Sequence, residues 1–281
     1  MTGYVPGGRL ADISRLLSDR DRLIIADIAK VRLLHTRQIE RLQFWQGTKL
    51  SNSRQARRVL KRLYDQKILK RLQRRIGGVY AGSAGFIYAL DSLGQRLMQV
   101  GGPAGGQRRR RPWEPSPAFQ DHILQVAELY VRLRELERNH PDVELVDYVA
   151  EPRCWRRFDN VEGTPQTLKP DAYARVAIGE FEQVSFIEVD RATEHVPTLR
   201  RKLAAYVAAF EAGVEQHGGE AFPNVVWVVP DQPRVTVLER AIGRLPPDHA
   251  ALFAVSIDGS ELETITNTNL TIHPEGGTQN L

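Results

Sequence analysis

The charges of this chain are divided at one place along its length. Residues 1–111 contain 24 Lys and Arg against 7 Asp and Glu, a net charge of +17. Residues 112–281 contain 15 basic against 27 acidic residues, a net charge of −12. A basic half is typical of a protein that binds a polyanion, and the acidic half cannot bind that polyanion by its overall charge. The division therefore predicts two bodies with different tasks.

Length and composition agree with two globular domains. The chain has 281 residues, 42% of them hydrophobic and 26% charged, which is enough for two cores of ordinary size. No apolar run approaches the roughly 20 residues of a membrane helix, and residues 1–20 lack the apolar stretch of a secretory signal. We therefore expect a cytoplasmic protein without membrane partners. Cys154 is the only cysteine, which excludes an intrachain disulfide and a Cys-rich zinc site.

The basic half has the element order of a winged helix-turn-helix domain. Ser18 and Asp21 form a capping-box pattern that predicts a first helix over residues 18–32. A second, short helix follows Thr36, and a third begins at residues 51–53. Two apolar segments, 68–72 and 86–90, flank a glycine-containing turn, which predicts a β-hairpin, the wing.

The third helix carries the candidate DNA contacts. It combines a narrow apolar stripe with many cations and has no acidic residue from Asn52 to Tyr64. A helix in the major groove needs cations for phosphates and forked donors for base edges. We expect Arg57 and Arg58 to contact bases, and Lys61 and Arg62 to contact phosphates. The full set of candidates is Asn52, Ser53, Arg54, Arg57, Arg58, Lys61 and Arg62 on the helix, with Arg71, Arg74 and Arg75 on the wing. The alternatives are a solvated basic face, RNA binding, and a winged helix that binds protein.

Composition also places the domain boundaries. Residues 101–117 contain glycines, four consecutive arginines and then three prolines, which is typical of a linker. The winged-helix domain is thus expected at 1–100, the linker at 101–117 and a second domain at 118–260. Residues 261–281 are polar and are expected to form a flexible tail.

The second domain is expected to be an αβββαβ fold, so that the whole chain is mixed α/β. Periodicity predicts a long helix over residues 119–137 and a second helix over 194–212. The predicted strands are 143–150, 171–178, 184–189, 224–229 and 252–257, with a helix at 235–245 before the last of them.

Two of these strands form a hairpin that brings two carboxylates together. If Gly179 and Glu180 are the turn, Asp171 lies directly opposite Glu188, with Cβ atoms roughly 5 Å apart on one face. Two carboxylates at this separation can bind a hard cation such as Mg²⁺.

These residues resemble two known groups of proteins. Pro170-Asp171 and the strand end Ile187 to Asp190 resemble the PD-(D/E)xK nuclease superfamily, which has a restriction-endonuclease-like fold. With the winged helix in front, and Lys202 and Tyr206 behind, the chain resembles the replication-relaxation family of plasmids and mobile elements from about residue 18 to 257. The resemblance implies a DNA-associated role in replication, relaxation or transfer. For an active nuclease it implies Asp171, Glu188 and Lys202 as catalytic residues, with Asp171, Glu188 and Asp190 as Mg²⁺ ligands.

One position departs from the nuclease pattern. A lysine is expected two residues after the acidic residue, but Asp190 occupies that place. Lys202, Lys169 and Arg191 are the candidate substitutes. A cleaving domain also needs a basic track for the DNA backbone, whereas this half is acidic and has one local basic and aromatic cluster, formed by Arg153, Trp155, Arg156 and Arg157. The sequence therefore favours a nuclease-like domain that is not catalytic, and it implies Mg²⁺ only if the domain is active.

The leading hypothesis is a sequence-specific double-stranded DNA-binding protein of a bacterial plasmid or mobile element. It would act in replication, relaxation or its regulation, and its second domain would bind another copy of the chain or replication and mobilisation proteins. One alternative is a Mg²⁺-dependent endonuclease or nickase. Another is a transcription regulator whose second domain senses a ligand or mediates oligomerisation.

Overall fold

The structure, a computed structural model, describes residues 7–72, 85–101, 115–216 and 221–266. The chain divides into two compact units, Met1–Val131 and Arg132–Leu281. Each unit contains helices and a β-sheet, so the predicted mixed α/β class is confirmed. Within the described ranges no helix is both long and apolar enough to cross a membrane.

The N-terminal unit combines helices with a small three-stranded antiparallel sheet. Its strands are β1 (Leu34–His35), β2 (Leu69–Leu72) and β3 (Ile87–Leu90), in the order β1-β3-β2. Its first five helices are α1 (Gly7–Leu16), α2 (Asp19–Val31), α3 (Thr36–Gln43), α4 (Lys49–Asp65) and α5 (Ser92–Gly101). The predicted element order is therefore present, with α1 as an addition that the sequence reading did not contain.

The predicted start of α2 agrees with the structure, whereas that of α4 does not. Ser18 and Asp21 form the expected capping box at α2. Helix α4 begins earlier than predicted, because Thr48 accepts a hydrogen bond from the backbone N–H of Ser51 and serves as its cap. The Ser51 hydroxyl is already inside the helix and donates to the carbonyl of Thr48 at 2.9 Å.

Helix α6 (Pro117–Asn139) contains the division between the two units. Up to Val131 its residues belong to the N-terminal unit, where Ile123 packs with Leu33, Leu72 and Ile87. The sequence reading had instead assigned the helix from residue 118 onward to the second domain.

Polar contacts within the N-terminal unit bind this part of α6 to α2 and α3. The Tyr130 hydroxyl donates to Asp27 Oδ1 at 2.7 Å, and Gln43 Nε2 donates to Asp27 Oδ2 at 2.7 Å. Gln38 Nε2 donates to Glu128 Oε2 at 3.0 Å, and Arg41 pairs with the same carboxylate.

The C-terminal unit is built on a five-stranded sheet in the order β10-β9-β8-β7-β4. These strands are β4 (Val143–Ala150), β7 (Ala172–Ile178), β8 (Phe181–Val189), β9 (Asn224–Val229) and β10 (Phe253–Ile257). Strand β7 pairs antiparallel with both β4 and β8, whereas β8, β9 and β10 run parallel to one another. The helices that follow are α7 (Val196–Glu211), α8 (Gln232–Ile242), α9 (Pro247–Ala250) and α10 (Glu261–Thr266).

The predicted register of the carboxylate hairpin is confirmed. Ile178 pairs with Phe181, and Ala172 pairs with Ile187. A two-residue turn leaves no freedom in this pairing, because a slip by one residue would move every side chain to the opposite face.

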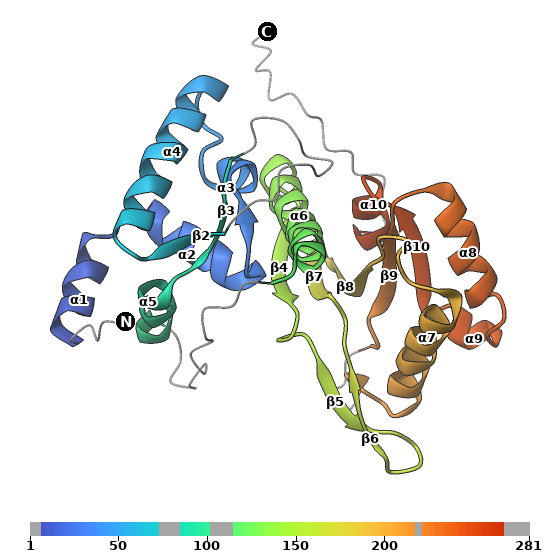
Figure 1. Cartoon of the computed structure of the whole chain (residues 1–281). Coiled ribbons are helices and arrows are strands. Elements are labelled where there is room, and N and C mark those ends of the chain that lie inside the picture. Colours follow the sequence, from blue (N-terminus) through green and yellow to red (C-terminus); the bar gives the residue numbers. More distant parts are fainter. Residues whose placement is uncertain (1–6, 73–84, 102–114, 217–220, 267–281) are drawn as a thin grey trace, which may run out of the picture. The chain divides into compact units, whose positions relative to one another are not determined.

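Two features of this unit differ from the sequence reading. Strands β5 (Arg156–Asp159) and β6 (Pro165–Leu168) form an unpredicted two-stranded arm between β4 and β7 (Figure 1). The expected tail is wrong for residues 261–266, which form α10 because Leu262 and Ile265 are buried and the buried carboxylate of Glu261 pairs with Arg132. Residues 267–281 lie outside the described ranges.

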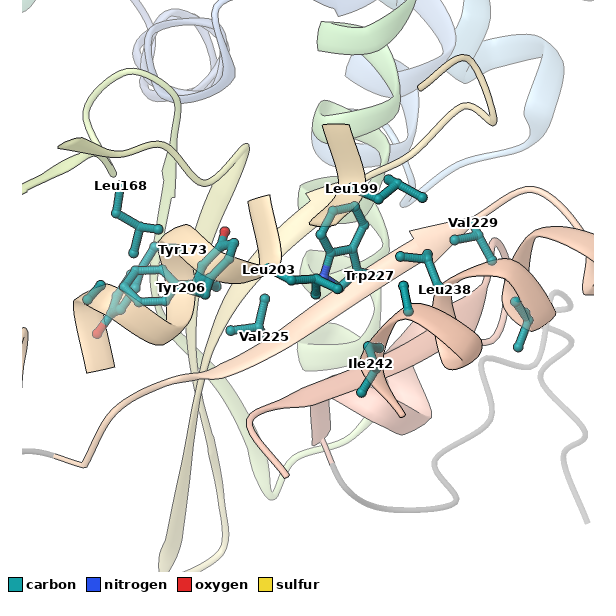
Figure 2. Packing of buried hydrophobic residues seen from close by; sticks show 14 of the residues in the cluster. Leu168, Tyr173, Leu199, Leu203, Tyr206, Val225, Trp227, Val229, Leu238 and Ile242 are labelled. Carbon is teal, nitrogen blue, oxygen red and sulfur yellow. The ribbon is translucent and has the colours of Figure 1, made fainter. Parts of the chain in front are cut away.

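The core of the C-terminal unit is centred on Trp227 of β9. Figure 2 shows this indole beside Leu199 and Leu203 of α7, in a cluster that also contains Leu238 and Ile242 of α8. Trp227 is fully buried. The apolar run of β9 is thus explained by burial on both faces of a central strand.

We expect the substitution Tyr130→Phe to destabilise the N-terminal unit by about 1–3 kcal/mol, because it removes a hydrogen bond from the buried Asp27 carboxylate. Urea unfolding followed by circular dichroism would measure the change. Tyr64→Phe is the matched control, since the Tyr64 ring packs under Arg71 and its hydroxyl has no partner in the described part of the chain. Equal unfolding free energies for the two variants would contradict the assignment of this helical segment.

Candidate functional site

Helix α4 has a buried face and a cationic face. Ala56, Leu60 and Leu63 are buried and hold the helix on its unit. Arg54, Arg57 and Arg58 are exposed. Their spacing of three and four residues places them on one stripe of the helix. In the described part of the chain none of these three guanidinium groups has a hydrogen-bond or ion-pair partner.

The two cations further along α4 are paired with acidic residues. Lys61 Nζ lies 2.6 Å from Asp65 Oδ2. Arg62 Nη2 lies 2.6 Å from Oδ1 of Asp21, which is completely buried. Burial raises the pKa of Asp21, but hydrogen bonds from Arg62 and Ser18 outweigh it, so that the net pKa is lowered. Arg62 therefore joins α4 to α2, a structural role that the sequence reading did not assign to it.

The polar residues at the start of α4 stabilise the turn that precedes it. Asn52 Nδ2 donates to the carbonyl of Gly47 at 2.9 Å, and Ser53 Oγ donates to Glu40 Oε2 at 3.1 Å. Both side chains are half-buried. These contacts orient the N-terminal end of α4 relative to α3.

Arg71 of β2 is enclosed by aromatic rings. Its guanidinium carbon lies 4.3 Å from the ring centre of Tyr64, 4.2 Å from that of Phe86 and 5.8 Å from that of Tyr88. Cation–π contacts of this kind attach β2 to α4 and to the segment that contains β3. The other wing candidates, Arg74 and Arg75, lie outside the described residues.

The carboxylates of the C-terminal unit lie where the predicted register places them. The backbone N–H of Asp171 donates to the carbonyl of Ile187 at 3.0 Å, and its Oδ2 accepts from the N–H of Val189 at 2.8 Å. Asp171 is therefore level with Glu188 on the neighbouring strand. Both side chains are buried, at 8% and 2% exposure.

Helix α7 supplies partners for both oxygens of Glu188. Lys202 Nζ donates to Oε2 at 2.9 Å, and the Tyr206 hydroxyl donates to Oε1 at 2.6 Å. Lys202 Nζ is also 2.9 Å from Glu194 Oε1 and 5.5 Å from the ring centre of Trp227. Of the three candidate substitutes for the missing strand lysine, Lys202 is therefore in contact with Glu188.

The environment raises the pKa values of both Glu188 and Lys202, but for different reasons. Burial, followed by the nearby charge of Asp171, raises the pKa of Glu188 to about 7, although Lys202 and Tyr206 oppose the shift. For Lys202, burial lowers the pKa, but Glu188 and Asp171 outweigh it and the net pKa is raised. Lys202 is consequently a permanent cation, while Glu188 titrates near neutrality.

Asp190 has different contacts from the other two carboxylates. Its Oδ2 lies 2.5 Å from Nε of the buried Arg234, and its Oδ1 accepts from the N–H of Ala192 at 2.8 Å. Arg234 Nη2 also donates to the carbonyl of Glu194 at 2.8 Å. Asp190 therefore attaches the segment that connects β8 with α7 to helix α8.

Of the other two candidate substitutes, Lys169 has its Nζ 5.1 Å from the ring centre of Trp155. The sequence reading did not assign Tyr206 as a partner of Glu188, although its spacing of four residues from Lys202 was the available signal. Arg234 is 44 residues from Asp190, and no local pattern connects the two.

The donor set has the right chemistry for Mg²⁺ only in part. Two facing carboxylates are suitable oxygen ligands, but both Glu188 oxygens already accept hydrogen bonds. Each of these oxygens has a second lone pair, so a magnesium ion would have to share Glu188 with Lys202 and Tyr206. Among the described residues no group of three or more His, Cys, Asp or Glu side chains is arranged to hold a metal ion.

We expect the stability of the C-terminal unit to fall as pH rises from about 5 to 8, because the folded state resists ionisation of Glu188, whose pKa is raised to about 7. The loss from this group is on the order of 3 kcal/mol. Unfolding free energies of the wild type and Glu188→Gln at both pH values would measure it, with the exposed turn residue Glu180→Gln as control. Parallel pH profiles for wild type and Glu188→Gln would disprove the assignment.

Comparison with known proteins identifies the family. The replication-relaxation family model matches residues 25–225. No match to the chain was found among curated proteins or among solved structures. The matched segment includes α4 as well as Asp171, Glu188 and Lys202, so it extends across both candidate sites. Because the match covers more than half of the sequence, the protein belongs to the replication-relaxation family.

Proposed function

We propose that this protein is a sequence-specific double-stranded DNA-binding protein, in which α4 is the recognition helix of a winged helix-turn-helix domain. The observation that carries the proposal is the exposed stripe of Arg54, Arg57 and Arg58, which has no partner in the described part of the chain. Arginine has the forked donors that pair with guanine in the major groove and with phosphate.

The surrounding elements support this role for α4. Helices α2, α3 and α4 precede the β2–β3 pair, and β1 completes a three-stranded sheet. A recognition helix must remain fixed to its domain while one face enters the groove. The buried residues Ala56, Leu60 and Leu63 and the ion pair between Arg62 and Asp21 meet that requirement.

Family membership sets the process in which this binding would act. It supports a role in the replication or relaxation of plasmid or mobile-element DNA. The net charge of +17 in residues 1–111 supports the same partner, since it attracts a polyanion over long range. Binding of a second copy, or of replication and mobilisation proteins, would be the task of the C-terminal unit.

The C-terminal unit in this proposal is a nuclease-like domain that does not cleave. Glu188 uses both oxygens on Lys202 and Tyr206, and Asp190 is paired with Arg234. These contacts pair the buried carboxylates of Glu188 and Asp190 with neighbouring donors, as is usual for buried polar groups in a structural cluster.

One observation favours a second candidate function, a Mg²⁺-dependent DNA endonuclease or nickase. Lys202 touches Glu188 and so supplies the cation that the strand pattern lacks. In such an enzyme Asp171 and Glu188 would hold the ion, which supplies Lewis-acid activation of water and phosphate. Lys202 would stabilise negative charge at the phosphate.

We expect Arg57→Ala, Arg58→Ala to weaken binding of duplex DNA by at least about tenfold, because two forked donors are lost from the groove-facing stripe. Fluorescence anisotropy with a labelled duplex, repeated over a range of salt concentrations, would measure the affinity and its salt dependence. The slope of log affinity against log salt should become shallower by about 1–2.

The matched control for this pair is Arg240→Ala, Arg244→Ala, which removes two exposed cations from the end of α8. It should leave duplex binding unchanged. If both double variants weakened binding equally, the effect would be one of overall charge and α4 would not be the recognition helix.

For the C-terminal unit we expect no nicking of supercoiled plasmid by the wild type in the presence of Mg²⁺ or Mn²⁺. Gel electrophoresis of the plasmid, beside Asp171→Asn, Glu188→Gln protein, would test this. Nicking by the wild type that is lost in the double variant would establish the enzyme and overturn the proposed scaffold role.

A further inference from the structure

The arm formed by β5 and β6 has an inward and an outward face. In its register Arg156 pairs with Leu168 and Arg157 pairs with Thr167. Side chains alternate between the two faces of a strand. Figure 1 shows the pair extending from the edge of the C-terminal unit, between the strands β4 and β7 that it connects.

The inward face binds the arm to its own unit. Leu168 is buried and Phe158 packs against the same core cluster. The Arg156 side chain pairs with Glu215, donates to the carbonyl of Cys154 at 2.8 Å and lies 5.2 Å from the ring centre of Tyr173. Arg156 is therefore occupied in packing and is not part of an open cationic surface.

The outward face is open and carries two members of the basic and aromatic cluster, Trp155 and Arg157. Arg157, Thr167 and Lys169 are exposed, and Trp155 keeps 37% of its surface accessible. Trp155 lies opposite Lys169 by continuation of the register, and the Lys169 Nζ is 5.1 Å from the centre of its ring. Arg157 has no partner in the described part of the chain.

The root of this face adjoins the carboxylate site. Cys154 Sγ donates to the carbonyl of Pro170 at 3.0 Å, and Pro170 is followed directly by Asp171. The backbone N–H of Glu151 donates to the carbonyl of Asp171 at 2.9 Å. Trp155 and Lys169 are thus the next residues outward from the two chain segments that meet beside Asp171.

We propose that the outward face of the arm binds single-stranded DNA. The proposal rests on the proposed DNA-binding function and names a second form of DNA for the same protein. An exposed indole stacks on unpaired bases, whereas the base faces of a duplex are covered by their neighbours. Arg157 lies two residues, about 7 Å, along the strand from Trp155, so that a guanidinium can contact a phosphate beside the stacked base.

The negative charge of the C-terminal half implies that single-stranded DNA would bind it only at the outward face of the arm. The C-terminal half has a net charge of −12 and repels a polyanion over most of its surface. A strand can therefore be held only where cations and an aromatic ring occur together. Replication and relaxation both expose single-stranded DNA, which gives such a surface a substrate.

The test uses the full chain with Arg57→Ala, Arg58→Ala, so that α4 contributes little, and a fluorescein-labelled oligonucleotide of about 20 thymidines, in the range of known single-strand site sizes. Anisotropy titrations should show binding that Trp155→Ala weakens roughly tenfold and that Trp155→Phe largely retains. Arg157→Gln, Lys169→Gln should make the salt slope shallower by about 1.4, since each phosphate contact on a single strand contributes about 0.7.

The matched control is Arg240→Gln, Arg244→Gln, which removes two exposed cations of the same unit away from the arm. It should leave oligonucleotide binding and its salt slope unchanged. The proposal is overturned if the α4 variant does not bind the oligonucleotide, if Trp155→Ala binds as well as Trp155→Phe, or if the control lowers the slope equally. Circular dichroism of each variant would verify that the fold is retained.

The two proposals can fail separately. Duplex binding that is insensitive to the α4 substitutions would overturn the recognition helix and leave the oligonucleotide result intact. Oligonucleotide binding that is insensitive to the arm substitutions would overturn the arm while duplex binding still depended on α4.

Discussion

The arrangement of the C-terminal unit depends on the buried carboxylate of Glu188, which requires hydrogen-bond and ion-pair partners. Glu188 has 2% of its surface exposed, and an ionised carboxylate in that position is costly unless it is paired and hydrogen-bonded. The Glu188 side chain extends from β8 toward α7. There Lys202 and Tyr206, one helical turn apart, donate hydrogen bonds to its two oxygens. The same ammonium binds Glu194 just before α7 begins. One ionisable group thus determines how strand, connection and helix meet.

The sequence predicted those parts of the fold that local rules determine. The Gly179-Glu180 turn and the alternation of the flanking strands were sufficient for the register of β7 and β8, which placed Asp171 opposite Glu188. The capping box at Ser18 was sufficient for the start of α2. The arm was missed because β5 and β6 have only four residues each, and short strands of mixed polarity carry little periodicity.

Side-chain partners were the least predictable part of the candidate sites. The five cations from Arg54 to Arg62 look equivalent in the sequence, yet in the described part of the chain Lys61 and Arg62 have acidic partners and the other three do not. Arg62 differs from Arg58 only by one turn, and the difference arises because Asp21 is buried beneath it. Asp190 likewise pairs with Arg234, which is distant in sequence. Such pairings depend on tertiary packing, which a composition or a motif does not contain.

Tyr130 of α6 is bonded to Asp27 of the N-terminal unit, which limits where related chains could exchange their domains by recombination. The change in charge occurs at residue 111, whereas the division in packing occurs between Val131 and Arg132. Residues 102–114 therefore connect α5 to a helix segment of the same unit. A chimaera joined at the apparent linker would give the N-terminal unit of one parent the α6 surface of the other. The first part of α6 must remain compatible with its partners Asp27, Gln38 and Arg41 in the N-terminal unit. We therefore expect recombination between relatives to keep residues 102–131 together with the unit that precedes them, although their composition is that of a linker at the start.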